Sequence, residues 1–381
     1  MRLRAASPAS HNGAMDSPTA LASRLLKTPL TDPVDLGGGR YTTVLRCRTG
    51  AGESVVVKAF PQTAQGRRGF AAEAAGLSFG AGGPELLATD RSRALVVMAD
   101  LGDVPTLADA LLGDDPGAVE DGLRAWARGL GRLAAASVDR RDELARLLDH
   151  FGNLPGTEDG TVPPADAWIA EDAAALPERL AEADVVLPPR VAAELAAELA
   201  AIGTAGGARY PAYTPGDTCP DNNLLTPAGL RLIDFEHACF QSVFLTAAYC
   251  RMPFSSCWCV FRLPDALAAA SERAYRDEVT RVYPELVEDA VWDAGVRQAM
   301  AVWTVDATVR LLPSCLREER HMHPTRRPVP TGRELLRHRW EMACDLAEFP
   351  AFAETMRRLL ALSDTHWHAA PLPPYPAFRH A

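Results

Sequence analysis

The sequence predicts an α+β protein of two lobes: a small antiparallel sheet with one main helix, followed by a large and mostly helical part. Two hydrophobic runs at 41–47 and 53–60 flank a glycine-containing turn, as the strands of a hairpin do. Beyond Pro105 the apolar residues recur at helical spacing, most regularly over 118–138. A chain of 381 residues, of which 48% are hydrophobic, is long enough to bury a core in each lobe.

Both lobes are expected to lie between irregular ends. We expect a flexible leader over 1–28, an N-terminal lobe over 29–100 and a helical C-terminal lobe over 101–364. The remaining tail, 365–381, ends in a proline-rich stretch that does not continue a helix.

A glycine-rich turn, made of Gly37, Gly38 and Gly39, precedes the first strand of the hairpin. Glycine has no Cβ, so the backbone amides of such a turn can approach phosphate oxygens. We therefore expect these residues to contact nucleotide phosphates. A purely structural turn is the alternative.

Lys58 lies among valines in the second strand of the hairpin, where a lysine is unexpected. The helix predicted over 68–80 contains one carboxylate, Glu73, among alanines. We expect Glu73 to pair with Lys58 and to hold it on the nucleotide phosphates. The alternative is a lysine on an edge strand that reaches into solvent.

Two further strands are expected at 84–89 and 94–98. The second runs into a short polar connector, after which a helix begins near Pro105. This pattern indicates the boundary between the lobes. Backbone groups of Ala99 and Leu101 in the connector are expected to bind an adenine edge.

The C-terminal lobe is expected to consist of amphipathic helices joined by loops, the longest of them over 152–164. The helices are expected at 118–138, 140–150, 189–202, 243–251, 265–282, 290–312, 331–348 and 352–362. A short strand at 210–213 leads into the stretch that carries the functional residues.

That stretch, 215–236, has three polar side chains at informative positions. Asp217 follows a glycine, so we expect it in a tight loop with an exposed carboxylate. Asn222 comes five positions later, and Asp234 follows a short hairpin that turns at 226–229. The hairpin is expected to fix Asp234 relative to Asn222.

These residue types, in this order, indicate phosphoryl transfer from ATP to an alcohol. Asp217 can orient the acceptor hydroxyl and accept its proton. Asn222 and Asp234 offer oxygen ligands to Mg²⁺, which bridges the nucleotide phosphates. Glu236 adds to the metal site or shapes the acceptor pocket. Taken singly, each residue has a structural alternative as a turn residue or a helix cap.

At these residues the chain resembles the aminoglycoside phosphotransferase and choline-kinase-like family, relatives of the protein kinases. The family pattern is His-Gly-Asp, four residues, Asn, then a hairpin and Ile-Asp followed by an aromatic residue. Here Pro215-Gly216-Asp217, Asn222 and Ile233-Asp234-Phe235 take these positions. The resemblance follows the order of parts over 35–260. It implies a protein-kinase-like fold, ATP with Mg²⁺, and phosphorylation of a hydroxyl group on a small molecule.

The pattern departs from the family at Pro215, which replaces the histidine and offers no side-chain hydrogen bond. A nucleotide-binding pseudokinase or scaffold without turnover is therefore an alternative. Asp221 and Asn223 are alternative metal ligands, and Asn222 is chosen on spacing alone. A protein kinase is a further alternative, which the absence of an Ala-Pro-Glu segment after Asp234 disfavours.

Composition limits the partners. The formal net charge of −10 argues against a nucleic acid or an anionic membrane. No apolar run reaches the roughly 18 residues that a membrane-spanning helix needs, and the start lacks the apolar segment of a signal peptide. We expect a cytoplasmic monomer or homodimer.

The eight cysteines show no paired CxxC spacing, so a zinc site is not expected, and most of them are expected to be reduced and buried. Cys257-Trp258-Cys259 brings two of them too close in sequence for an ordinary disulfide. Metal binding at this segment is the lesser alternative. The segment is expected to pack in the core or to form a wall of the acceptor pocket.

Acidic residues of the helical part admit two interpretations. We favour a solvated helix face over a site for a cationic acceptor. The residues are Glu171, Asp172, Glu178, Glu182, Asp184, Asp265 and Glu272.

Overall fold

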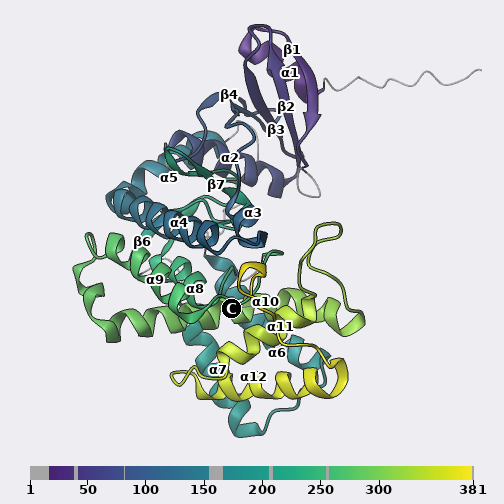
Figure 1. Cartoon of the computed structure of the whole chain (residues 1–381), viewed down its shortest axis with the longest axis vertical. Coiled ribbons are helices and arrows are strands. Elements are labelled where there is room, and N and C mark those ends of the chain that lie inside the picture. Colours follow the sequence, from purple (N-terminus) through teal and green to yellow (C-terminus); the bar gives the residue numbers. More distant parts are fainter. Residues whose placement is uncertain are drawn as a thin grey trace, which may run out of the picture. The chain divides into compact units, whose positions relative to one another are not determined.

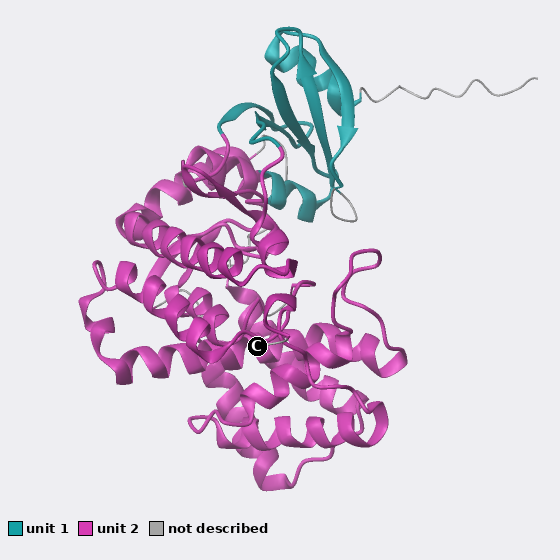
Figure 2. Ribbon diagram, viewed as in Figure 1, with its two compact units in different colours: residues 1–70, 85–102 teal, residues 71–84, 103–381 magenta. Residues whose placement is uncertain are grey.

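The computed structural model describes residues 17–37, 42–80, 82–153, 166–205, 209–254 and 257–379. The chain divides into two compact units, which are coloured separately in Figure 2. Unit 1 comprises residues 1–70 and 85–102, and unit 2 comprises residues 71–84 and 103–381.

Unit 1 is built on a five-stranded antiparallel sheet in the order β1-β2-β3-β5-β4 (Figure 1). The strands are β1 (Leu30–Asp35), β2 (Thr43–Thr49), β3 (Ser54–Ala59), β4 (Leu86–Asp90) and β5 (Leu95–Ala99). The predicted hairpin and the two later strands are confirmed. Periodicity did not predict β1, because only Leu30 of its six residues is buried and a proline interrupts it.

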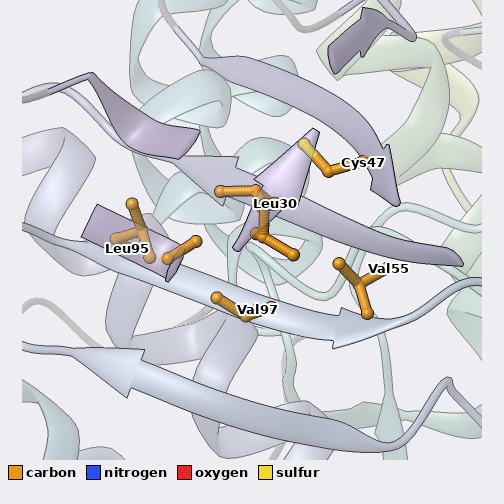
Figure 3. Packing of buried hydrophobic residues seen from close by; sticks show 7 residues of the cluster. Leu30, Cys47, Val55, Leu95 and Val97 are labelled. Atoms are coloured by element: carbon orange, nitrogen blue, oxygen red, sulfur yellow. The ribbon is translucent and has the colours of Figure 1, made fainter. Parts of the chain in front are cut away.

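Helix α1 (Pro18–Leu26) contacts the strands of this sheet and completes its core. Figure 3 shows part of that core, in which Leu30, Cys47, Val55, Leu95 and Val97 are buried together. Ala22 of α1 is fully buried in the same cluster. The prediction of a flexible leader is therefore wrong for residues 18–26, because their apolar side chains pack on the sheet.

Lys58 lies on β3, the central strand, with 6% of its surface exposed. Its neighbours across the sheet are Val44 on β2 and Val96 on β5. Its Nζ lies 5.0 Å from the centroid of the Phe60 ring. The alternative of an edge-strand lysine is wrong, since hydrogen-bonded strands flank β3 on both sides.

Asp100 fixes the connector that follows β5. Its carboxylate accepts hydrogen bonds from Ser54 Oγ (2.7 Å) and the Gly102 amide (3.0 Å), and it pairs with Arg46 Nε (2.7 Å). Burial raises the pKa of Asp100, but these donors outweigh it, so the pKa lies below its usual value.

Unit 2 is mostly helical. Helix α4 packs against α9, and α10 packs against α6, α8 and α11. The helices are α3 (Leu107–Leu112), α4 (Pro116–Ser137), α5 (Arg141–Gly152), α6 (Ala167–Glu182), α7 (Pro189–Gly203), α8 (Val243–Arg251), α9 (Asp265–Val279), α10 (Asp289–Arg317), α11 (Gly332–Ala343) and α12 (Pro350–Leu362). The predicted helices are confirmed within a few residues at their ends, except that α10 and α11 end about five residues from the predicted positions.

The division differs from the predicted N-terminal lobe of 29–100. Helix α2 (Ala64–Ser78) begins in unit 1, but residues 71–84 pack with unit 2. The reason is close packing on the predicted functional stretch: a Cβ on Gly76 would lie 2.8 Å from Cβ of Phe235, and Phe79 stacks on Tyr213 at 4.6 Å between ring centroids.

Among the described residues, none of the helices has the length and apolar character needed to cross a membrane. The tail after α12 is largely irregular, yet Tyr375 is fully buried and donates a hydrogen bond to the Cys259 carbonyl at 3.0 Å.

We predict that Asp100→Asn lowers the free energy of unfolding by about 1–3 kcal/mol at neutral pH, because the partly buried ion-pair partner of Arg46 loses its charge. The folded-state pKa is lowered, so the contribution is complete above the pKa of an unfolded aspartate and is lost as the pH falls through the folded value. The difference from the parent protein should therefore shrink in acid. Urea unfolding at several pH values measures it.

The control is Glu53→Gln, which changes an exposed carboxylate on the neighbouring turn and should cost less than ~0.5 kcal/mol. Equal effects of the two substitutions would contradict the role of Asp100.

Candidate active site

Two antiparallel strand pairs in unit 2 bring the predicted functional residues together. Strand β6 (Pro211–Thr214) pairs with β9 (Cys239–Ser242), and Thr214 lies opposite Cys239. Pro215 follows β6 and Ala238 precedes β9, so the two loops join the sheet at neighbouring strand ends.

The second pair fixes Asn222 relative to Asp234, as predicted. Strands β7 (Asn223–Thr226) and β8 (Gly229–Leu232) form the hairpin. Beyond its end, the Ile233 amide donates to the Asn222 carbonyl at 3.1 Å. The Asn222 side chain donates through Nδ2 to the Asp217 carbonyl at 3.3 Å. One hydrogen-bonded loop system thus carries Asp217, Asn222 and Asp234.

The adjacent residues Asn222 and Asn223 differ in burial and in hydrogen bonding. Asn223 is fully buried, and its Nδ2 donates to the carbonyls of Thr218 (3.1 Å) and Cys219 (2.6 Å). Asn223 therefore holds the loop that contains Asp217. Asn222 is half-buried, and because its Nδ2 is the donor, its Oδ1 is the atom suited to a metal ion.

Asp234 has a left-handed backbone conformation, with φ of 66°. Such a conformation is uncommon outside glycine and is found at sites where the surrounding structure holds it in place. The next residue supplies that constraint: the Phe235 ring is fully buried, and its amide donates to Glu73 Oε2 at 2.8 Å.

Glu73 is 1% exposed. Its carboxylate thus fixes the backbone directly after a predicted metal ligand, a role that sequence reasoning missed. The predicted pairing of Glu73 with Lys58 joins residues of two separately described units, and it stays a prediction.

The backbone conformation and the close packing at position 216 require a glycine. Its φ is 91°, and a Cβ there would collide with the backbone carbonyl of His237. The loop before Asp217 therefore lies directly against the chain after Asp234. This contact also brings His237 to the site, which the sequence analysis did not single out.

Asp217 is exposed, and its Oδ1 accepts a hydrogen bond from the Cys219 amide at 2.9 Å. Desolvation by the surrounding protein raises the pKa of Asp217, and the negative charges of Asp234 and Asp221 raise it further. The Cys219 amide and the imidazole of His237 act in the opposite direction.

Two carboxyl groups, those of Asp172 on α6 and Asp306 on α10, form a pair in the helical part. Asp306 is 3% exposed, and its Oδ1 lies 3.2 Å from Arg310 Nη1. Burial and the charge of Asp306 raise the pKa of Asp172 to about 6, and the two carboxyl groups share a hydrogen bond. The charge of Asp217 also acts on Arg310 and on the buried Tyr249. Of the acidic residues considered in the sequence, Glu171, Glu178 and Glu182 are exposed, as a solvated face requires.

The predicted nucleotide-binding residues of unit 1 stay predictions. Gly38 and Gly39 lie outside the described residues. Gly37 has φ of 78°, and its amide donates to Asp35 Oδ1 at 2.9 Å. The Ala99 amide donates to the Glu85 carbonyl at 2.9 Å, so this amide is already engaged within unit 1.

The donor set suits magnesium. Asn222 offers an amide oxygen and Asp234 a carboxylate, and both are half-buried. Hard oxygen donors, few in number, are the ligands that Mg²⁺ takes when phosphates and water complete its octahedron.

No protein-family model and no curated protein sequence matches this chain. Solved structures do. An ethanolamine kinase from Plasmodium vivax is similar over 86% of this chain and 83% of its own, with a TM-score of 0.50 and 11% identity. This likeness shows that the chain has the fold of a small-molecule kinase. It confirms the predicted fold class.

Two further solved structures are similar at lower TM-scores. A macrolide 2'-phosphotransferase from Brachybacterium faecium has a TM-score of 0.46 and 16% identity, and the match covers 78% of this chain and 92% of that one. A choline/ethanolamine kinase family protein from Mesorhizobium loti has a TM-score of 0.45 and 16% identity, with 87% and 93% covered.

We predict that Gly216→Ala destabilises unit 2 more than Gly229→Ala. Both glycines have positive φ, which costs alanine about 1 kcal/mol. Only the Cβ at position 216 meets another atom, so Gly216→Ala should cost a further ~1–3 kcal/mol. Urea unfolding of the two variants measures the difference, and equal losses would show that the loop does not lie against His237.

Proposed function

We propose that this chain is a phosphotransferase that moves the γ-phosphoryl group of ATP to a hydroxyl group of a small molecule. The observation that carries the proposal is the hydrogen-bonded loop system of Asp217, Asn222 and Asp234. The fold shared with an ethanolamine kinase supports it.

Asp217 is proposed to orient the acceptor hydroxyl and to accept its proton. Its raised pKa makes the carboxylate a better base than a solvated aspartate. Asn222 Oδ1 and the Asp234 carboxylate would hold Mg²⁺, which neutralises phosphate charge when it is bound with ATP. Lys58 is proposed to contact the nucleotide phosphates, as the resemblance to the kinase family implies for a lysine on this strand.

Pro215 does not by itself argue against turnover. The backbone around Asp217 is held by other groups: the Asn223 amide, the Cys219 N–H and the contact of Gly216 with His237. These contacts fix the loop without the histidine of the family pattern. The pseudokinase alternative is therefore left to experiment.

The acceptor is proposed to carry a cationic amine. Asp172 and Asp306 form a carboxyl pair close enough to the loop system for the charge of Asp217 to act on the paired Arg310. With both carboxyl groups ionised, the pair and Arg310 carry a net negative charge. The buried Arg339 also acts on Asp306, and a bound ammonium group would add to the cations that face this carboxyl pair.

We predict that Asp217→Asn lowers turnover of Mg·ATP with a hydroxyl acceptor by about 10²–10⁴-fold. ATP should still raise the melting temperature of the variant, because Asp217 is not proposed to bind the nucleotide. Phosphate transfer to a panel of amino alcohols and amino sugars measures the turnover.

Asp277→Asn, at an exposed position on α9, is the control and should leave turnover unchanged. Full turnover by Asp217→Asn would remove its assignment as the base. Thermal stabilisation by ATP with no phosphorylated product from any acceptor would instead favour the pseudokinase, and transfer to peptides alone would favour a protein kinase.

We predict that the KM of a cationic acceptor falls as the pH rises through about 6, because Asp172 loses its shared proton and gains charge. Asp172→Asn should remove this dependence and raise KM by about tenfold, with little change in kcat. Glu171→Gln, which changes the exposed carboxylate next to it, is the matched control. A KM that is equally pH-dependent in both variants would contradict an amine site at Asp172.

A further inference from the structure

Three cysteines gather beside the loop that carries Asp217. Cys219 and Cys257, 38 positions apart, form a disulfide with Cα atoms 5.7 Å apart. Cys259 Sγ lies 3.2 Å from Cys257 Sγ, and all three sulfurs lie within 4.8 Å of one another. Six of the eight cysteines are free, which agrees with the expectation that most are reduced, and Cys219 and Cys257 are the exception.

Asp221 contacts the tryptophan that lies between Cys257 and Cys259 in the sequence. The Trp258 indole, between the two cysteines of its segment, donates through Nε1 to Asp221 Oδ2 at 2.9 Å. The other oxygen, Asp221 Oδ1, is buried and has no hydrogen-bond partner among the described residues. Asp221 is two positions from Cys219, so its hydrogen bond to Trp258 keeps the loop of Cys219 beside the Cys257–Cys259 segment when the disulfide is reduced.

We propose that Cys219, Cys257 and Cys259 form a zinc site, which the Cys219–Cys257 disulfide closes and its reduction opens. Three protein ligands and a water molecule are a donor set that Zn²⁺ takes in tetrahedral geometry. With Zn–S bonds of about 2.3 Å, the sulfurs of such a tetrahedron lie about 3.8 Å apart. All three sulfurs lie within 4.8 Å of one another, and once reduction breaks the Cys219–Cys257 bond this pair can separate to the spacing of a tetrahedron.

The chemistry balances with a dithiol as the reductant. One thiolate of the dithiol attacks Cys219, whose side chain is only partly buried, while Cys257 and Cys259 are buried. The S–S bond of the protein breaks, Cys257 leaves and takes up a proton, and the second thiol of the dithiol closes its own disulfide and releases Cys219. Two electrons pass to the protein. Zinc then displaces the thiol protons of the three cysteines.

The site adjoins the active-site loop, because the Cys219 amide donates to Asp217 Oδ1. Exchange of a disulfide for a metal ion at Cys219 therefore acts two residues from Asp217. Any effect on turnover rests on the proposed function, but zinc binding does not. Zinc can be measured without ATP or acceptor, so failure of one proposal is distinguishable from failure of the other.

The experiment compares the oxidised full-length chain with the same chain after reduction by a dithiol and desalting without oxygen. Each is incubated with zinc chloride and passed through a desalting column, and zinc is measured in the protein fraction. We expect about one zinc ion per chain in the reduced protein and almost none in the oxidised protein. Thiol titration should show that reduction adds the two thiols of the disulfide.

Cys259→Ser separates the zinc site from a simple disulfide. It leaves the Cys219–Cys257 pair intact, so reduction should still add the same thiols, while zinc affinity falls by at least about tenfold in competition with a chromophoric chelator. Cys344→Ser, at a free half-buried cysteine that follows α11, should bind zinc as the parent does.

The proposal is overturned if the reduced parent protein gains its thiols and binds no zinc, which would indicate a structural disulfide only. It is also overturned if the oxidised protein binds zinc equally, or if Cys259→Ser binds zinc as tightly as the parent. If Cys259→Ser does not fold, the comparison of oxidised and reduced parent protein decides alone.

Discussion

The hydrogen bond from the Phe235 amide to the buried Glu73 carboxylate fixes the backbone directly after Asp234. It forms only if α2 approaches that loop closely, and glycines permit the approach: a Cβ on Gly83 would lie 2.6 Å from the Phe235 ring. The stacking of Phe79 on Tyr213 extends the same contact to β6. One buried carboxylate therefore ties a helix, the hairpin and the loop of Asp217 into one body. Its position also explains why residues 71–84 belong to unit 2.

Negative charge is concentrated on this body. Asp217, Asp221 and Asp234 lie close enough that the charges of the latter two raise the pKa of Asp217. A divalent cation on Asn222 and Asp234 would reverse the effect of Asp234 and stabilise the ionised form of Asp217. The carboxyl pair of Asp172 and Asp306 adds a second such region, where Arg310 compensates only part of the charge. Both regions suit cations, which agrees with the acidic balance of the whole chain.

Backbone geometry fixes much of the loop that carries Asp217. A Cβ at Gly216 would collide with the His237 backbone, and the Ile233 amide donates to the Asn222 carbonyl. Pro215, in contrast, occupies a position whose side chain is not needed to hold the loop, because Asn223 and Cys219 do so through backbone groups. The disulfide of Cys219 adds a covalent constraint to the same loop.

The sequence by itself determined the two-part α+β architecture, the long helices and the order of Asp217, Asn222 and Asp234. These follow from local periodicity and turn chemistry, which neighbouring residues decide. Spacing alone favoured Asn222 over Asn223 in the sequence. The tertiary structure showed that Asn223 is buried and that its Nδ2 donates to the Thr218 and Cys219 carbonyls. It alone paired Asp172 with Asp306 and Cys219 with Cys257, because contacts between residues far apart in the chain leave no local pattern. The candidate site residues and their order could thus be predicted from local sequence patterns. Their geometry depends on packing between residues far apart in the chain.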